Sequence, residues 1–224
     1  MFERIHVIGT GRAGGAIRSR LAEGDARVTD GRNLDAGADL VLLCVPDQAI
    51  AEVAAAVPIG PWVGHVSGAT RLVALDPHER RFSVHPLQTL TGARGPEQLD
   101  GAWAAISGET DEALARARWL AETLGLLPFE VADADRTLYH AAAVIGGNFL
   151  VTLHDVAVRL LAEVGAPEAA IVPLMARTIE NRFELTGPIA RGDWATVEAH
   201  LEVLAERAPD LVPLYRALSE ATRR

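Results

Sequence analysis

Residues 4–22 read RIHVIGTGRAGGAIRSRLA, and this stretch decides the fold. Residues 4–8 form a compact apolar run typical of a buried strand, and a helical pattern follows from residue 13 to about residue 22. Between them lies a cluster of glycines. A strand, a glycine cluster and a helix in this order are typical of the first βαβ unit of a dinucleotide-binding fold.

The cluster at residues 9–14, GTGRAG, fits the dinucleotide fingerprint residue by residue. Gly9 permits a tight turn, Gly11 lets the backbone approach a pyrophosphate, and Gly14 lets the helix pack on the strand. The amino end of the helix offers free amides and the positive end of its dipole to phosphate groups. The sequence therefore predicts that the cofactor is bound by Gly9, Thr10, Gly11, Arg12, Ala13 and Gly14.

Further short apolar runs recur along the first half of the chain, at residues 27–29, 40–45, 63–66, 82–84, 102–106 and 129–131. Helical patterns lie between several of them, at residues 48–56 and 111–124. Strands that alternate with helices predict βαβ units and a mainly parallel sheet. The run LVLLCV at residues 40–45 is apolar throughout, as expected of a parallel strand that is covered on both faces.

The pattern changes near residues 131–135, after which every predicted element is a helix. One long helix is expected over residues 137–164, opened by Asp133 or Asp135 as a cap and ended by Gly165 and Pro167. Three more helices are expected, over residues 168–185, 194–206 and 209–218. We therefore predict an α/β domain with a Rossmann-type parallel sheet at residues 1–132 and an all-α domain at residues 133–224.

The choice between NAD and NADP depends on residues near the end of the second predicted strand, where two cues conflict. Asp30 lies where a carboxylate could hold the two hydroxyls of a ribose, which favours NAD. Arg32 lies where a guanidinium could pair with a 2′-phosphate, which favours NADP. Arg12 would add a second cation near the adenosine end. We predict NADP and leave NAD open.

Three successive predicted strands end in polar or turn-forming groups. The first is followed by Val45-Pro46-Asp47, the next ends in His65-Val66-Ser67-Gly68, and the third ends in a His85-Pro86 turn. In parallel sheets of this kind, ligands bind at the carboxyl ends of the strands. The sequence therefore predicts a lined pocket at this edge, with Val45, Pro46, Asp47, Ser67 and Gly68 among the residues that bind the cofactor.

Six stretches of the sequence together resemble one protein family: GTGRAGG (9–15), LLCVPD (42–47), HVSGA (65–69), HPLQTL (85–90), LYHAAAVIGGNFLVTL (138–153) and LTGPIARGD (185–193). They resemble bacterial Rossmann-like proteins that carry a C-terminal domain of unknown function, number 2520, within the 6-phosphogluconate dehydrogenase-like superfamily. The resemblance implies an NADP-type Rossmann domain, a helical second domain and a dimer formed through those helices. It implies an oxidoreductase, and it does not name a substrate.

Reduction of a carbonyl or imine needs a hydride from the cofactor and a proton from a positioned acid. The β-hydroxyacid dehydrogenases of the same superfamily use a lysine on the first long helix of the second domain, but this chain contains no lysine. The same helix instead carries His140 and Asn148, which in one continuous helix would lie about 80° and about 12 Å apart. We predict His140 as proton donor or orienter and Asn148 as a ligand of the substrate or of the nicotinamide amide.

Other residues offer alternatives for this chemistry. His85 is the second candidate for the proton donor, because prephenate dehydrogenase-like proteins have a similar His-Pro element beside their substrate. Tyr139 could donate a proton too, although a tyrosine on the packing face of a helix is more often part of a core. The neighbouring glycines 146 and 147 weaken a helix by about 1 kcal/mol each relative to alanine, which suggests close approach of a cofactor or another helix.

Composition excludes several classes of function. The net charge of −9 argues against a nucleic-acid-binding surface, and no metal-ligand spacing or nucleophile elbow is present. The longest apolar stretches are interrupted by Gly, His or Asp, so no membrane span is expected. The strand pattern that begins near the first residue leaves no signal peptide, and the single Cys44 suits a reduced cytoplasm.

The sequence thus predicts a cytoplasmic NAD(P)-dependent oxidoreductase that acts on a small, anionic carbonyl, imine or hydroxy compound. The long apolar helix predicts a homodimer formed through the C-terminal helices. The alternative is a non-catalytic nucleotide-binding or scaffolding dimer that has lost turnover, and the missing superfamily lysine is the main feature that favours it.

Overall fold

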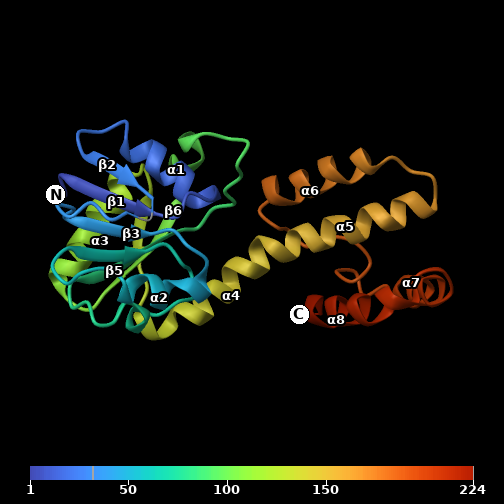
Figure 1. Ribbon diagram of the computed structural model, residues 1–224. Helices are drawn as coiled ribbons and strands as arrows, with labels where there is room; N and C mark the ends of the chain where they lie inside the picture. The colour runs from blue at the N-terminus through green and yellow to red at the C-terminus, as the bar shows by residue number, and fades with distance from the viewer. Residues whose placement is uncertain (32, 224) are drawn as a thin grey trace. The chain divides into compact units, whose positions relative to one another are not determined.

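The computed structural model describes residues 1–31 and 33–223, and within these residues seven strands form one sheet. The strands follow one another in the spatial order β2-β1-β3-β4-β5-β6-β7. Their bounds are β1 Arg4–Ile8, β2 Arg27–Asp30, β3 Leu40–Leu43, β4 Trp62–His65, β5 Arg81–Pro86, β6 Trp103–Gly108 and β7 Leu127–Glu130. This is the predicted Rossmann-type sheet (Figure 1).

The sheet is mainly parallel, as predicted, but its last two strands are reversed. Strands β1 to β5 are parallel to one another, β6 is antiparallel to β5, and β7 is parallel to β6. The connection from β5 to β6 contains the short 3₁₀ helix η3 (Pro96–Leu99) in place of a crossover helix. Antiparallel neighbours need no crossover over the face of the sheet, and this connection joins β5 to β6 in that arrangement.

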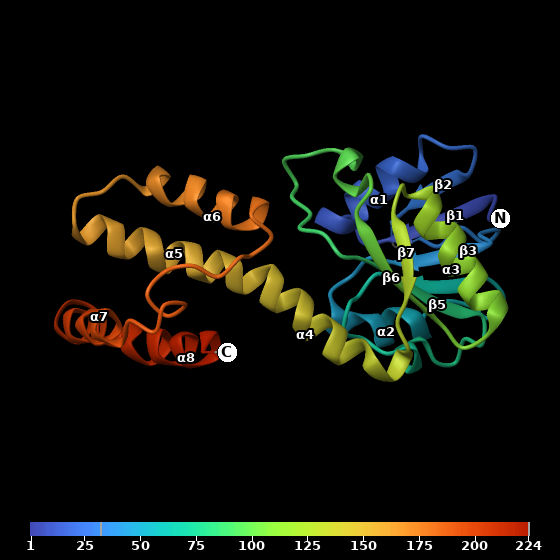
Figure 2. The same cartoon turned by 180° about the vertical axis from the view of Figure 1, so that it is seen from behind.

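Helices cover both faces of the sheet. Helices α1 (Arg12–Leu21) and α3 (Asp111–Thr123) bury their apolar residues against one face, and Figure 2 shows α3 across β6 and β7. Helix α2 (Ile50–Ala55) and the 3₁₀ helix η2 (Leu72–Leu75) cover the other face. Strand β3 is therefore buried on both sides, because Leu40 and Leu42 join the first core while Val41 and Leu43 join the second.

The predicted long helix over residues 137–164 is wrong in one respect, because it is divided. Helix α4 (Arg136–Gly146) ends at Gly147, whose ψ of −74° departs from the helix, and α5 (Asn148–Glu163) follows. Asp133 and Asp135 do not cap α4 with their side chains. The Asp133 carboxylate instead accepts hydrogen bonds from the backbone of Leu72 and from the side chain of Arg71.

The helical run Asp133–Glu163 has the length and apolar composition that a membrane span needs, in contrast to the expectation from its interruptions. Length and composition alone are weak evidence, because core helices of other proteins meet the same criterion. One end of this run is tied to the sheet by Arg136, whose side chain is completely buried.

Contacts divide the chain into two compact units, Met1–Thr152 and Leu153–Arg224. The sequence-based boundary at residues 132/133 marks the change to all-helical structure, whereas contacts group α4 with the sheet. The second unit contains most of α5 together with α6 (Ile171–Glu180), α7 (Trp194–Arg207) and α8 (Val212–Thr222). Its small core includes Leu204, Ala208 and Leu211, and the side chain of Asp193 caps α7.

Candidate functional site

The glycine turn between β1 and α1 has the geometry that the fingerprint predicts. Gly9 has a φ of +100°, and a Cβ there would lie 2.4 Å from the carbonyl oxygen of Cys44, which follows β3. A Cβ at Gly14 would lie 1.9 Å from the carbonyl oxygen of Gly9, so only glycine lets α1 approach the strand this closely. A Cβ at Gly11 would have no atom within 4 Å among the described residues, so the backbone there is open to a ligand.

A cleft of about 690 Å³ opens beside this turn. The ten-residue helix α1 starts at the turn, and its first turn carries no acidic side chain. Free amides and the positive end of the helix dipole therefore favour an anion there. The residues that line the cleft come from the ends of β1 and β3, from α2 and from the turn after β2: Ile8, Gly9, Thr10, Gly31, Leu34, Val45, Pro46, Ala49, Glu52, Val53, Ala56 and Val57.

The adenosine end of the predicted cofactor site is only partly described. Asp30 pairs with Arg18 of α1, with Oδ2 3.2 Å from Nε. The buried ring of His6 contacts the Thr29 hydroxyl at 2.8 Å and the Gly31 carbonyl oxygen at 3.1 Å, which fixes the end of β2. Arg12 is exposed, and Arg32 lies outside the described residues.

A second cavity, of about 590 Å³, lies at the carboxyl end of β5. It brings together three predicted site residues, His85, His140 and Asn148, and adds Tyr139. The other residues that line it are Leu87, Gln88, Thr89, Phe129, Ala142, Ala143, Val144, Gly146 and Gly147. None of these thirteen lining residues is acidic.

His85 is the centre of this cavity's polar contacts. Its Nδ1 lies 2.7 Å from the hydroxyl of Tyr139, and its ring centroid lies 5.9 Å from that of His140. A Cβ at Gly68 would lie 2.5 Å from Cδ2 of His140 and 2.9 Å from Nε2 of His85. Because Gly68 has no side chain, both imidazole rings fit beside it.

Helix α4 supplies one side of the site from a single face. Arg136, Tyr139 and His140 have the i, i+3, i+4 spacing that places side chains together on a helix. Tyr139 and His140 contact His85 through a hydrogen bond and ring packing, respectively. Arg136 extends into the sheet and is completely buried.

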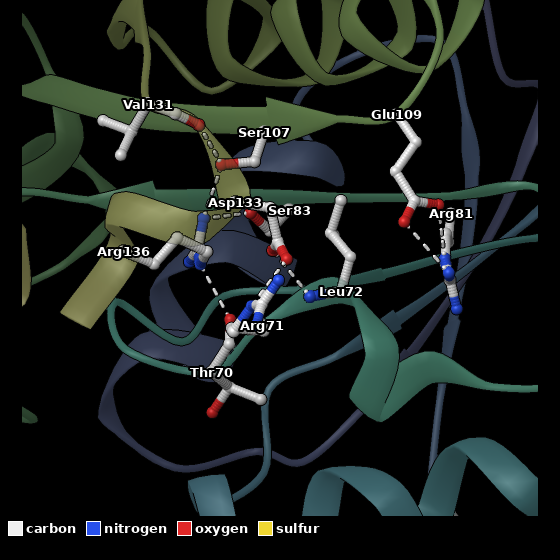
Figure 3. Close-up of polar contacts among 10 residues, drawn as sticks. All are labelled: Thr70, Arg71, Leu72, Arg81, Ser83, Ser107, Glu109, Val131, Asp133 and Arg136. Carbon is white, nitrogen blue, oxygen red and sulfur yellow. Dashed lines mark hydrogen bonds and ion pairs between the residues drawn. The ribbon is translucent and has the colours of Figure 1, made fainter.

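The Arg136 guanidinium binds neutral oxygen atoms from four residues. Figure 3 shows three of them, Thr70, Ser83 and Ser107. The guanidinium donates to the carbonyl oxygens of Ser67 and Thr70, the two ends of the turn after β4. It also donates to the hydroxyls of Ser83 on β5 and Ser107 on β6. All hydrogen-bond partners of this buried cation are neutral, and the carboxylates of Asp133 and Asp47 act on it through their charge alone.

Burial and this charge shift the pKa values of the site. Burial first, and then the charges of Arg136 and His140, lower the pKa of His85 to about 4. Burial, followed by Arg136 and His85, lowers the pKa of His65 to about 3. Burial raises the pKa of Tyr139 to about 12 although Arg136 opposes the rise. At neutral pH both histidines are therefore neutral and the tyrosine keeps its proton.

His65 stabilises the turn that contains Gly68. Its Nδ1 accepts a hydrogen bond from the backbone amide of Ser67 at 3.2 Å, so the ring proton lies on Nε2. This Nε2 is buried and has no partner among the described residues. The Ser67 hydroxyl is bonded to Thr70, so Ser67 shapes the turn with its side chain.

The structure separates the predicted site residues into two groups. Gly9, Thr10, Val45 and Pro46 line the cleft, while His85, His140 and Asn148 line the second cavity. Seven other predicted residues line neither: Gly11, Arg12, Ala13, Gly14, Asp47, Ser67 and Gly68. Gly68 nevertheless abuts both rings, and the Asp47 charge acts on His85. The predicted angle between His140 and Asn148 does not apply, because α4 ends between them.

Sequence reasoning missed Arg136, and it left Tyr139 open as a proton donor while favouring a core position for it. The signal that could have found them is their spacing from His140 at the start of a helix that follows the sheet. The hydrogen-bond partners of Arg136 are 29 to 69 positions away in the sequence, so no local pattern indicates these contacts. No cluster of three or more potential metal ligands occurs within residues 1–31 and 33–223.

Comparisons with known proteins agree with this architecture. The chain is similar to a "putative NADP oxidoreductase" from Bacteroides fragilis (22% identity, TM-score 0.83, 99% of this chain and 98% of that one covered). It is similar to a protein from Thermotoga maritima (25% identity, TM-score 0.75, 98% and 100% covered) and to 1-pyrroline-5-carboxylate reductase from Streptococcus pyogenes (15% identity, TM-score 0.65, 98% and 98% covered). No curated protein matches the sequence.

The family assignment rests on the second half of the chain. A family model described as a domain of unknown function (DUF2520) matches residues 102–222, which is more than half of the sequence. The likeness to these solved structures shows the Rossmann-type fold that the sequence predicts. The chain belongs to the DUF2520 family, and it combines a Rossmann-type sheet with a helical C-terminal part.

Proposed function

We propose that this protein is an NADP-dependent oxidoreductase that acts on a small, anionic carbonyl, imine or hydroxy compound. The observation that carries the proposal is the pair of cavities at the carboxyl edge of the sheet. One is bordered by the glycine turn, and the other by His85, Tyr139 and His140. When bound, the nicotinamide would supply or accept the hydride, and the protein would supply or accept the proton.

The residues beside the glycine turn fit a dinucleotide. Gly11 has open space where an alanine Cβ would intrude on a pyrophosphate, and the amino end of α1 favours negative charge. Gly9, Thr10, Val45 and Pro46 would border the cofactor in the cleft. The likeness to a Bacteroides fragilis protein named for NADP supports the same class of ligand.

NADP is favoured over NAD by the position of the acidic residue at the end of β2. Asp30 is paired with Arg18, so its carboxylate is engaged by a cation instead of being free for the ribose hydroxyls. Arg12 is exposed at the start of α1, where it can reach a phosphate. The predicted contribution of Arg32 stays a prediction from the sequence.

The imidazole pair would contact the reacting group, and the neutral ring of His85 would act there as a hydrogen-bonding group. His85 replaces His140 as the first candidate for this role. Its Nδ1 is hydrogen-bonded to Tyr139, and its Nε2 lies next to the space that a side chain at Gly68 would fill. His140 packs against His85 and would orient the ring or the substrate. Asn148 lines the same cavity, at the first position of α5, and would bind the substrate or the nicotinamide amide.

An anionic substrate suits the electrostatics of this cavity. The residues that line it include no carboxylate, and the buried guanidinium of Arg136 lies beneath His85 and Tyr139 with neutral partners only. A fixed cation close to a partly dry cavity stabilises a nearby negative charge. The chain has no lysine at the position that the superfamily uses, and the positive charge near this cavity comes from Arg136.

The test is a fluorescence titration with NADPH, followed by measurement of NADPH consumption with a panel of 2-oxo acids and cyclic imines. We expect saturable binding and turnover that falls at least about tenfold in His85→Gln, with NADPH affinity unchanged. Tight binding without turnover of any substrate would favour the non-catalytic nucleotide-binding alternative. Binding of neither NADPH nor NADH would contradict both functions.

A further inference from the structure

The chain has two tyrosines, and the hydroxyl of each lies 2.7 Å from Nδ1 of a histidine. Tyr139 and His85 form one pair, with ring centroids 5.6 Å apart and an angle of 81° between the rings. Tyr215 and His200 form the other, at 5.8 Å and 87°. The geometry is nearly the same, but the first pair lines the candidate active site and the second lies in the helical unit.

The direction of the hydrogen bond in the first pair follows from the groups around it. His85 is neutral at neutral pH, so its ring carries a single proton, on Nδ1 or on Nε2. If Nδ1 carried it, the proton of the half-buried Tyr139 hydroxyl would have no acceptor among the described residues. A phenol hydroxyl is also a stronger donor than the N–H of a neutral imidazole, and the unprotonated imidazole nitrogen is a stronger acceptor than a phenol oxygen, so Tyr139 donates to Nδ1.

This direction puts the ring proton of His85 on Nε2, at the surface of the cavity. A Cβ at Gly68 would lie 2.9 Å from this nitrogen, and the glycine leaves that space free. The charged or titratable groups that face His85 are Arg136, Tyr139 and His140 on α4, His65 on β4 and Asp47 after β3. Of these, only Tyr139 has a hydrogen bond to His85 among the described residues.

We propose that Tyr139 is a positioning residue that holds His85 as the Nε2–H tautomer, so that the cavity presents a neutral N–H donor to a carbonyl oxygen of the substrate. This inference rests on the proposed oxidoreductase function and narrows its substrate class. A carbonyl oxygen accepts such a hydrogen bond, and the bond strengthens as negative charge develops on the oxygen. A protonated imine has no lone pair to accept it, and a hydroxyl that loses its proton needs an acceptor instead.

The experiment reads the tautomer directly and needs no substrate. In the full-length protein labelled with ¹⁵N-histidine, long-range ¹H–¹⁵N correlation spectra near neutral pH distinguish a protonated ring nitrogen from an unprotonated one. The signals of His85 and His200 are assigned from His85→Gln and His200→Gln. We expect Nδ1 of His85 to be unprotonated and Nε2 to be protonated in the wild-type protein, with widely separated ¹⁵N shifts.

Tyr139→Phe removes the hydroxyl and keeps the ring, so the two ¹⁵N shifts of His85 should move toward each other as both tautomers become populated. The matched control is Tyr215→Phe, which should alter the signals of His200 and leave those of His85 unchanged. A protonated Nδ1 in wild-type His85 would overturn the proposal, as would His85 shifts that Tyr139→Phe does not change.

Two features keep the outcomes distinct. The wild-type tautomer alone can overturn the proposal, even if Tyr139→Phe does not fold. An NADPH titration of the same samples tests the proposed function separately, because absence of binding would contradict that function without altering the tautomer.

Discussion

Gly11 and Gly15 both lie at the start of α1, but we expect alanine at these two positions to have different effects on NADPH affinity. Neither would place a Cβ closer than 3.8 Å to another atom, so alanine should be accommodated at both positions. We expect Gly11→Ala to lower NADPH affinity at least about tenfold, because the methyl group occupies the space that a pyrophosphate needs. Gly15→Ala should leave affinity unchanged and raise the free energy of unfolding by about 0.5–1 kcal/mol.

Fluorescence titration and urea denaturation of the two variants check this pair. Equal NADPH affinities for Gly11→Ala and Gly15→Ala would contradict the assignment of the glycine turn to the pyrophosphate.

His65 and His85 predict how stability depends on pH. Their pKa values, about 3 and about 4 in the folded protein, lie below the ordinary value of 6.5. Between pH 6.5 and pH 4 the unfolded chain therefore binds more protons, and the free energy of unfolding should fall as pH falls. Each histidine contributes a slope of at most about 1.4 kcal/mol per pH unit in this window.

Urea denaturation at a series of pH values measures this slope. His85→Gln should make the decrease shallower by up to about 1.4 kcal/mol per pH unit, because one titrating group is lost. A wild-type stability that stays constant from pH 6.5 to pH 4 would show that these imidazoles are not held neutral.

The sequence predicts the roles of some single residues and not of others. The roles of Gly9 and Gly14 follow from a local motif, although a side chain at either position would also meet Cys44, which follows β3. Arg136 could not be assigned in this way, because its acceptors are carbonyl and hydroxyl oxygens on other elements. Its neutral partners leave no complementary charge in the sequence to indicate a pair.

At the scale of elements, the attachment of α4 to the sheet depends on one buried side chain. Arg136→Met would leave the carbonyl oxygens of Ser67 and Thr70 and two buried hydroxyls without this donor. We expect the free energy of unfolding to fall by about 2–4 kcal/mol. Denaturation curves measure it.

Arg71→Met is the matched control, because the same end of α4 also has an exposed ion pair. The Arg71 side chain is 58% exposed and pairs with Asp133. Loss of an exposed pair should cost less than about 1 kcal/mol. Similar losses of stability in Arg71→Met and Arg136→Met would show that the buried contacts do not anchor α4.

The sequence pattern predicted the alternation of strands and helices but not two changes of direction. The break between α4 and α5 lies at Gly147, inside an apolar pattern that continues on both sides. Hydrophobic periodicity therefore suggested one helix. The reversal at β6 was missed because strand signals carry no direction. The connections before β5 and before β6 both lack an α-helix, yet β5 is parallel to β4 and β6 is antiparallel to β5.

At the scale of the whole molecule, the helices of the C-terminal part expose more apolar surface than a lone chain usually tolerates. On α6, Val172, Leu174 and Ile179 are at least half exposed, as are Phe149 and Val151 on α5. We expect a homodimer that covers these side chains, which agrees with the sequence-based prediction.

Analytical ultracentrifugation of two matched variants tests this expectation. Val172→Glu on α6 should shift the protein toward monomer without unfolding it, because the side chain is 53% exposed in the single chain. Val203→Glu on α7 changes a valine of similar exposure, 52%, and should leave the dimer intact. A wild-type protein that sediments as a monomer at micromolar concentration would contradict the dimer.

The central claim, that the two cavities form one cofactor and substrate site, is tested most directly by a crystal structure of the protein with NADP. We expect the pyrophosphate beside Gly11 and the amino end of α1, and the nicotinamide in contact with the cavity that His85 and His140 line. A cleft that stays empty at saturating NADP, or a nucleotide bound away from the glycine turn, would contradict the account.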